Sequence, residues 1–138
     1  GAAVPAVRSL RSDGTLRVHE AADVTNAALT CVRSALDHDG SVAVIATAPR
    51  LDAVVAGLRA AGTPVNTGSG DARVSAVPAA LAKGLEFDHV VVVEPADIVD
   101  AEARGANRLY VALTRAVSRL DVVHAGPLPD LLGDTVSG

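Results

Sequence analysis

The sequence predicts an α/β fold in which helices cover a mainly parallel β-sheet, and three observations support this class. Short β-branched apolar runs alternate with segments of helical periodicity that are about a dozen residues long. Hydrophobic residues make up 49% of the chain but aromatic residues only 1%, so the core must consist of Val, Leu, Ile and Ala. A length of 138 residues fits one hydrophobic core. We expect the crossovers between parallel strands to be right-handed.

The first half of the chain alternates between predicted strands and helices. Residues 1–15 show no clear period and are interpreted as an N-terminal extension or edge strand, followed by a short strand over 16–19. Helical spacing of apolar residues predicts a helix over 24–36, with Asp23 as its N-cap and Gly40 as its stop signal. Residues 41–47 predict a strand, and residues 51–61 a second helix closed by Gly62.

The second half continues this alternation after a loop over 63–71, which is rich in turn residues. Residues 73–77, 90–94 and 121–124 predict strands, and the uninterrupted valines of the second indicate burial on both faces. A helix is predicted over 103–117, and residues 127–132 suggest a short terminal helix. The helix over 103–117 has an apolar arc expected to pack on the sheet, formed by Ala106, Leu109, Tyr110, Leu113, Ala116 and Val117.

Composition excludes several functional classes. The net charge of −4 gives no global field that would attract nucleic acid, so such binding would need a local patch or another part of a larger protein. The single Cys31 excludes an internal disulfide and fits a reducing cytosol, and no apolar run is long enough for a signal peptide or a membrane span. The chain has no P-loop, because its only lysine, Lys83, is followed by glycine rather than Ser or Thr.

Two features between residues 83 and 115 have both a structural and a functional interpretation. Arg104, Arg108 and Arg115 share one side of the predicted helix, either as a solvated face or as a site that recognises anions. In the segment KGLEFDH, Gly84 and Phe87 are suited to a turn and its anchor. Glu86 either remains solvated or accepts a hydrogen bond from a ligand hydroxyl, as carboxylates do from ribose in nucleotide sites.

Other candidate residues are weaker. The four histidines show no paired ligand spacing, so we predict no metal site. The acidic residues Glu94, Asp97, Asp100 and Glu102 are expected to stabilise the start of the helix that follows them through its dipole. Because ligands of parallel α/β sheets bind beyond the carboxyl ends of the strands, the turns after Val77 and Glu94 are the first places to expect a site.

The segments KGLEFDHVVVVEP and RLYVALTRAVSRLDVVH resemble motifs V and VI of the UvrD/Rep-like superfamily 1 helicases. The resemblance is specific for residues 82–124 and implies that residues 16–138 form the second, C-terminal RecA-like lobe of such a motor, a three-layer domain without its own P-loop. In this family ATP lies between two RecA-like lobes, of which the first carries the Walker A lysine and the catalytic carboxylate. The resemblance therefore implies that the N-terminal lobe is a partner and holds most of the ATP and its Mg2+.

Positions carried over from the motifs imply specific roles. Arg115 in ALTRA would be the catalytic arginine that contacts the γ-phosphate, Glu86 in KGLEF would contact the sugar, and Gly84 would allow close approach of the backbone. Lys83, Arg50 and Arg108 are further candidates for ATP contacts. The resemblance implies an ATP-hydrolysing helicase or translocase, in which the isolated chain would be inactive.

Departures from the family pattern leave the substrate open. The family has His or Thr with Ser before KGLEF for a DNA backbone contact, whereas residues 77–82 read VPAALA. The large 2B insertion is replaced by about ten loop residues. This compact layout is more similar to the HelD group of helicase-like ATPases, which act on bacterial RNA polymerase. DNA, RNA polymerase or another protein is thus an expected partner of a cytoplasmic bacterial protein, and a nucleotide-insensitive interaction module is the alternative.

Overall fold

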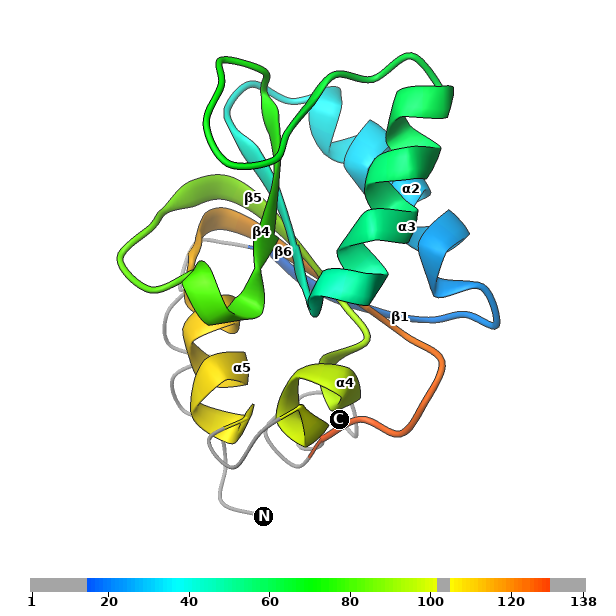
Figure 1. Ribbon diagram of the computed structural model, residues 1–138, viewed down its shortest axis with the longest axis vertical. Helices are drawn as coiled ribbons and strands as arrows, with labels where there is room; N and C mark the ends of the chain where they lie inside the picture. Colours follow the sequence, from blue (N-terminus) through cyan, green and yellow to red (C-terminus); the bar gives the residue numbers. More distant parts are fainter. Residues whose placement is uncertain (1–14, 102–104, 130–138) are drawn as a thin grey trace.

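The computed structural model describes residues 15–101 and 105–129. Within these residues six strands form one sheet in the order β1-β6-β5-β2-β4-β3, and every pairing between them is parallel (Figure 1). The strands are β1 (Thr15–Glu20), β2 (Val42–Ala46), β3 (Val65–Asn66), β4 (Val74–Pro78), β5 (Phe87–Val93) and β6 (Ala116–His124). The helices are α2 (Val24–Leu36), α3 (Ala48–Ala60), the 3₁₀ turn η1 (Ala79–Leu81), α4 (Pro95–Asp100) and α5 (Gly105–Leu113).

The sheet is the middle layer of three, because both of its faces are covered by helices (Figure 1). On the central strand β5, Val91 and Val93 pack toward α2 and α3, whereas Val90 and Val92 pack toward α4 and α5. All four valines are fully buried, as expected for a strand with helices on both sides. The predicted fold class is therefore confirmed.

The first half of the chain follows the sequence-based prediction closely. The Asp23 carboxylate accepts a hydrogen bond from the Asn26 N–H at 3.0 Å and caps α2 as expected. The helix ends at Leu36, four residues before the predicted stop at Gly40, which instead forms part of the turn into β2. The loop predicted over 63–71 contains the short edge strand β3.

The turn at Gly40 is held by side chains from distant elements. Arg73 donates hydrogen bonds to the carbonyls of Leu36, His38 and Gly40, and the Asp88 carboxylate accepts one from the Ser41 N–H at 2.8 Å. Gly40 has a φ of +111°, and a Cβ there would lie 2.5 Å from the Asp88 carboxylate oxygen. Glycine is needed here both for its conformation and for the space.

The second half departs from the prediction at the helix predicted over 103–117. Helix α5 ends at Leu113, and Ala116 and Val117 begin β6 instead of continuing the helix. The chain must turn here because Phe87 of β5 pairs with Ala116, which brings the backbone back into the sheet. Val117 is therefore 45% exposed rather than buried, and Tyr110 on α5 is 43% exposed. Residues 103 and 104 lie outside the described part of the chain.

Other corrections concern the connections. Strand β5 ends at Val93, one residue earlier than predicted, and the acidic segment after it contains the helix α4. Residues 127–129 are not helical, and the rest of the predicted terminal helix, like residues 1–14, lies outside the described residues. Among the residues that the structure describes, no helix is both long and apolar enough to span a bilayer.

Replacing Gly40 with Ala should destabilise the protein more than replacing Gly62 with Ala. Both glycines have positive φ, but a Cβ at Gly62 meets no described atom within 4 Å, whereas one at Gly40 collides with Asp88. We expect a loss of unfolding free energy of about 1 kcal/mol for G62A and about 2 to 4 kcal/mol for G40A, measured by urea denaturation. Equal losses would show that the contact with Asp88 does not constrain the turn.

Candidate functional site

The residues singled out from the two sequence motifs meet at the amino ends of β5 and β6. The segment Gly84–Glu86 directly precedes β5, and Arg115 directly precedes β6. Because these strands are parallel neighbours, their starts lie at the same edge of the sheet. The expectation that a site would lie beyond the carboxyl ends does not hold for these residues, since the motif positions come before their strands rather than after them.

The turn before β5 has an open and solvent-exposed surface. Gly84 has a φ of +83°, and no atom of residues 15–101 or 105–129 lies within 4 Å of where its Cβ would be, so these residues leave the backbone accessible from that side. The neighbouring side chains of Lys83 and Glu86 are exposed, and Glu86 makes no hydrogen bond or ion pair within the described residues. Phe87 is half-buried against the core on the α5 side and anchors the turn as predicted.

Arg115 connects the end of α5 to this turn. Its Nε donates to the Val111 carbonyl at 3.0 Å, its Nη1 to the Leu85 carbonyl at 3.2 Å, and its Nη2 to the Thr114 hydroxyl at 3.0 Å. The Phe87 N–H in turn donates to the Arg115 carbonyl at 3.0 Å. A guanidinium has five N–H groups, so these three bonds leave one on each terminal nitrogen for a ligand. This arrangement can bind a planar or tetrahedral oxyanion.

The predicted arginine stripe does not extend to Arg115. Arg115 lies in the turn beyond α5, so it does not share a helix face with Arg108. Arg108 is half-buried and lines a cavity of about 200 Å³ together with Thr47 and Pro78, which follow β2 and end β4. It therefore lies toward the carboxyl edge of the sheet, away from Arg115. Arg104 is outside the described residues.

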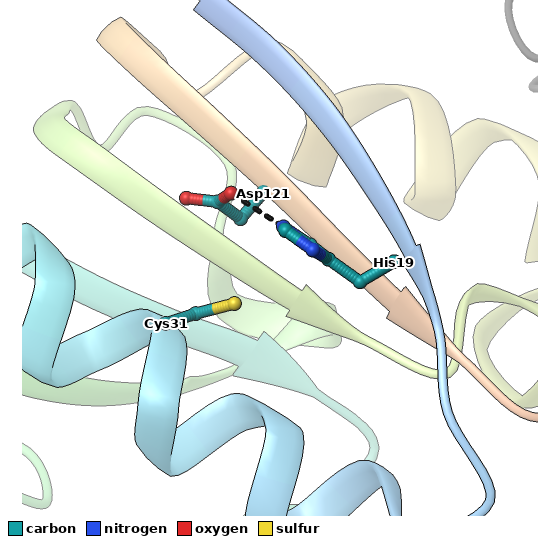
Figure 2. Close-up of side chains that lie close together, drawn as sticks. All are labelled: His19, Cys31 and Asp121. Atoms are coloured by element: carbon teal, nitrogen blue, oxygen red, sulfur yellow. Dashed lines mark hydrogen bonds and ion pairs between the residues drawn. The ribbon is translucent and has the colours of Figure 1, made fainter.

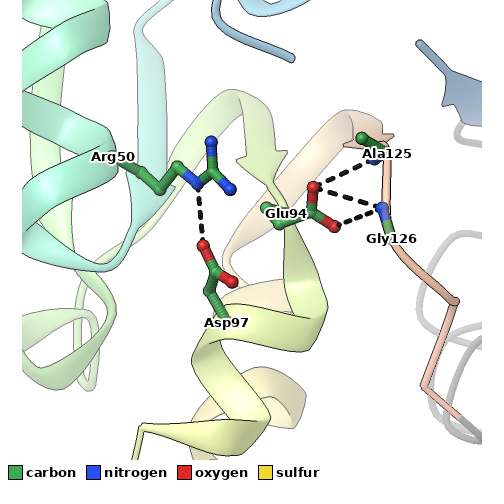
Figure 3. A network of polar contacts seen from close by, with 5 residues as sticks. All are labelled: Arg50, Glu94, Asp97, Ala125 and Gly126. Atoms are coloured by element: carbon green, nitrogen blue, oxygen red, sulfur yellow. Dashed lines mark hydrogen bonds and ion pairs between the residues drawn. The ribbon is translucent and has the colours of Figure 1, made fainter. Parts of the chain in front are cut away.

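Arg50 also lies at the carboxyl edge of the sheet, where its guanidinium is paired with an acidic side chain (Figure 3). The Arg50 Nε donates to the Asp97 carboxylate at 2.7 Å, and both side chains are a little over one-third exposed. The hydrogen bond to Asp97 is the main cause that raises the pKa of Arg50 above its ordinary value. The structure does not bring Arg50 into contact with the turn at Gly84 or with Arg115.

Glu94 has a structural role at the same edge that differs from the predicted one. It is buried, has a φ of +53°, and makes no side-chain cap to α4. Its carboxylate instead accepts hydrogen bonds from the Ala125 N–H at 3.0 Å and the Gly126 N–H at 3.2 Å, directly after β6 (Figure 3). Glu94 therefore fixes the chain after β6, whereas Asp97 lies in the first turn of α4, where an acidic residue was expected.

Sequence analysis missed a polar cluster between β1, β6 and α2. The His19 Nε2 lies 2.8 Å from the Asp121 Oδ1, and the thiol of Cys31 is nearby. Close spacing of ligand residues in the sequence does not reveal this cluster, because its residues are separated by up to 102 positions. The parallel pairing of the first and last predicted strands is the signal that would have placed His19 beside Asp121.

Comparisons with known proteins show similarity to helicase C-terminal domains. Residues 74–123 match the family of the UvrD-like helicase C-terminal domain. The C-terminal domain of a possible DNA helicase from Lactobacillus plantarum superposes with a TM-score of 0.65 and 24% identity, over 91% of this chain and 85% of that one. No curated protein sequence matches the chain.

Two structures of the helicase nonstructural protein 10 of an arterivirus are also similar. A crystal structure of this helicase gives a TM-score of 0.58 at 14% identity, covering 86% of this chain and 30% of that one. Its complex with DNA gives 0.61 at 16%, covering 89% and 33%. The chain thus has an α/β fold similar to that of a helicase C-terminal domain, and the resemblance stated from the motifs is supported by the family match over residues 74–123.

Replacing Glu94 with Gln should reduce stability more than replacing Asp97 with Asn. Glutamine offers one oxygen where the buried carboxylate uses both to accept backbone hydrogen bonds, so E94Q should cost about 1 to 3 kcal/mol. The Arg50–Asp97 pair is partly exposed, and D97N should cost less than about 1 kcal/mol. Chemical denaturation measures both, and a larger loss in D97N would contradict the structural role given to Glu94.

Proposed function

We propose that this chain is the C-terminal lobe of an ATP-dependent UvrD-like helicase or translocase, and that its amino edge completes a nucleotide site held mainly by another lobe. The observation that carries the proposal is the direct contact between the two motif segments. Arg115 binds the carbonyl of Leu85, and Phe87 binds the carbonyl of Arg115. The arginine and the glycine-containing turn therefore form one structural unit.

Arg115 is proposed to stabilise the charge that develops on the γ-phosphoryl group of ATP. Three hydrogen bonds fix the guanidinium before any ligand arrives, so little reorganisation is needed when charge appears. The remaining N–H on each terminal nitrogen can grip two phosphate oxygens at once. Closure of this lobe on a partner lobe would then depend on the γ-phosphate, which couples hydrolysis to movement.

The turn before β5 suits the sugar of a nucleotide. The exposed Glu86 carboxylate can accept hydrogen bonds from ribose hydroxyls, and the open side of Gly84 allows the ligand to approach the backbone. Lys83 is exposed next to them and can add a positive charge. These residues can contact a nucleotide but cannot hold its phosphates, because this chain has neither a P-loop nor a second lysine. Groups outside this chain must therefore bind the phosphates.

The proposed nucleotide site needs a partner lobe, because this chain supplies no P-loop to hold the phosphates of ATP. A preceding RecA-like lobe is proposed to bind most of the ATP and its Mg2+. The similar arterivirus helicase has been solved with DNA, which supports DNA as the substrate. With a net charge of −4, DNA binding by this lobe would depend on local contacts rather than on its overall field.

A protein partner such as RNA polymerase is the second candidate, and one observation favours it. Where the family resemblance leads us to expect hydroxyl side chains for DNA, the chain has η1, and Leu81 of η1 is 66% exposed. Leu81 and Leu85 border a mainly apolar groove of about 290 Å³ between η1 and α3. Such a surface is better suited to apolar side chains than to a phosphate backbone.

Replacing Arg115 with Ala in the longer protein that contains this lobe should abolish ATP hydrolysis. Arginines that stabilise phosphoryl transfer contribute about 10³ to 10⁵ in rate, so kcat should fall by a factor in this range. R115K should rescue little, because an ammonium cannot grip two oxygens from one plane. Steady-state ATPase assays measure the change.

The exposed Arg33 on α2 provides the matched control. R33A removes the same charge away from the motif segments and should retain wild-type ATPase activity. Circular dichroism should show that R115A remains folded. A folded R115A protein with undiminished turnover would contradict the nucleotide role and favour the interaction module.

The isolated chain should neither hydrolyse ATP nor bind it tightly. It supplies an arginine and a sugar contact but none of the phosphate-cradling backbone that a P-loop provides. Isothermal titration with Mg-ATP should give no saturable binding at micromolar concentrations. Robust turnover by the 138-residue chain would show that it holds a complete site of its own.

A further inference from the structure

The polar cluster between β1, β6 and α2 contains three different metal-ligating side chains (Figure 2). His19 comes from β1, Asp121 from β6 and Cys31 from α2, and their ligand atoms all lie within 4.8 Å of one another. The sulfur of Cys31 points from the helix toward the sheet, where the His19 ring meets the Asp121 carboxylate (Figure 2). Neither nucleotide nor partner binding, as proposed above, uses any of these residues.

The cluster is rigid on one side and open on the other. Asp121 and Cys31 are only 3% and 8% exposed, so packing holds them in place. The His19 side chain is 38% exposed and lies at the edge of a pocket of about 360 Å³ that the cluster lines. An ion can therefore enter from solvent, and the pocket has room for a water molecule as a fourth ligand.

We propose that His19, Cys31 and Asp121 form a binding site for a transition-metal ion of the zinc class. Imidazole, thiolate and carboxylate are the three side chains that bind Zn2+, and three of them with one water complete a tetrahedron. Tetrahedral bond lengths place ligand atoms about 3.3 to 3.6 Å apart. The His19 and Asp121 atoms, now 2.8 Å apart, must therefore separate by about 0.5 Å, and a pair at the 4.8 Å limit must approach by about 1.2 to 1.5 Å. Rotation of the exposed His19 ring can supply most of this movement.

The thiol of Cys31 is poorly suited to nucleophilic chemistry, and a metal ion must displace its proton in order to bind. Burial, followed by the nearby Asp121 carboxylate, raises the pKa of Cys31 to about 11, although Arg119 and Arg17 oppose this shift. The thiol therefore stays protonated and unreactive near neutral pH. Metal binding replaces the proton: the S–H bond breaks, a bond from sulfur to the metal forms, and the proton passes to solvent.

Two arginines lie near the cluster, and their positive charges repel a bound cation. The Arg119 Nε lies 3.4 Å from the Asp121 Oδ2, and this nitrogen has no hydrogen-bond partner in the described part of the chain. Arg17 lines the same pocket. Thiolate and carboxylate together neutralise a divalent ion, which limits the repulsion. Ions that need several oxygen ligands, such as Mg2+ and Ca2+, are disfavoured. Arg119 can hold Oδ2 of Asp121 while Oδ1 binds the metal, as outer partners of metal ligands do.

Metal binding at this site would join three elements that are distant in sequence. Strand β1 is at the edge of the sheet and pairs only with β6 within the described residues. An ion bound to His19, Asp121 and Cys31 would fix β1 to both β6 and α2. Because the ion binds the folded state, it should raise the thermal stability of the chain.

Titration of the 138-residue chain with Co2+ tests this proposal. Cobalt replaces zinc in tetrahedral sites and reports its ligands by colour. We expect saturation at one equivalent, with a sulfur-to-cobalt charge-transfer band, visible d–d bands of a tetrahedral ion, and displacement by Zn2+. Loss of an outer partner of a metal ligand typically weakens binding about 10- to 100-fold, so H19A, C31S and D121N should each weaken it at least as much.

The exposed His38, outside the cluster, provides the control, and H38A should bind Co2+ like the wild type. A second measurement does not need a variant of any of the three proposed ligands. Zn2+ should slow the alkylation of Cys31 to the same extent in the folded wild type and in folded H38A. The proposal would be overturned if Co2+ produced no charge-transfer band. Wild-type affinity in H19A, or alkylation of Cys31 that Zn2+ does not slow, would overturn it as well.

Discussion

The parallel pairing of β5 with β6 is the constraint on which the rest of the structure depends. Four consecutive buried valines place β5 in the middle of the sheet, where helices cover it from both sides. The pairing of Phe87 with Ala116 then requires α5 to end at Leu113. The same register places Arg115 beside the turn that contains Gly84 and Glu86. The position of the buried, apolar strand β5 thus determines which polar residues lie together at its amino end.

The two edges of the sheet differ in how their polar groups are used. At the carboxyl edge, Arg50 is paired with Asp97, and buried Glu94 accepts two backbone hydrogen bonds. These bonds offset the conformational cost of about 1 kcal/mol or more for a left-handed Glu94. At the amino edge, Glu86 is exposed and Arg115 retains two N–H groups. Polar groups available to a ligand are therefore found at the amino edge.

Sequence reasoning succeeded where local patterns determine the structure. The valines of β5, the Asp23 cap and the turn at Gly84 depend on residues close to one another in the chain, and each was predicted correctly. The end of α5 was predicted incorrectly. Ala116 and Val117 match the apolar periodicity of a helix, and only the pairing of their strand with β5 shows that they belong to β6. The ion pair of Arg50 and the contact between His19 and Asp121 also depend on tertiary packing. The motif resemblance found Glu86 and Arg115, but only the structure shows that their segments touch.

The central claim is that the amino edge of this lobe faces a nucleotide. It is tested most directly by a structure of the longer protein bound to Mg2+ and a non-hydrolysable ATP analogue. We expect both terminal nitrogens of Arg115 to lie within hydrogen-bond distance of γ-phosphate oxygens and Glu86 to contact the ribose. A nucleotide bound instead at the carboxyl edge, with Arg115 still making only its present contacts to Val111, Leu85 and Thr114, would contradict it.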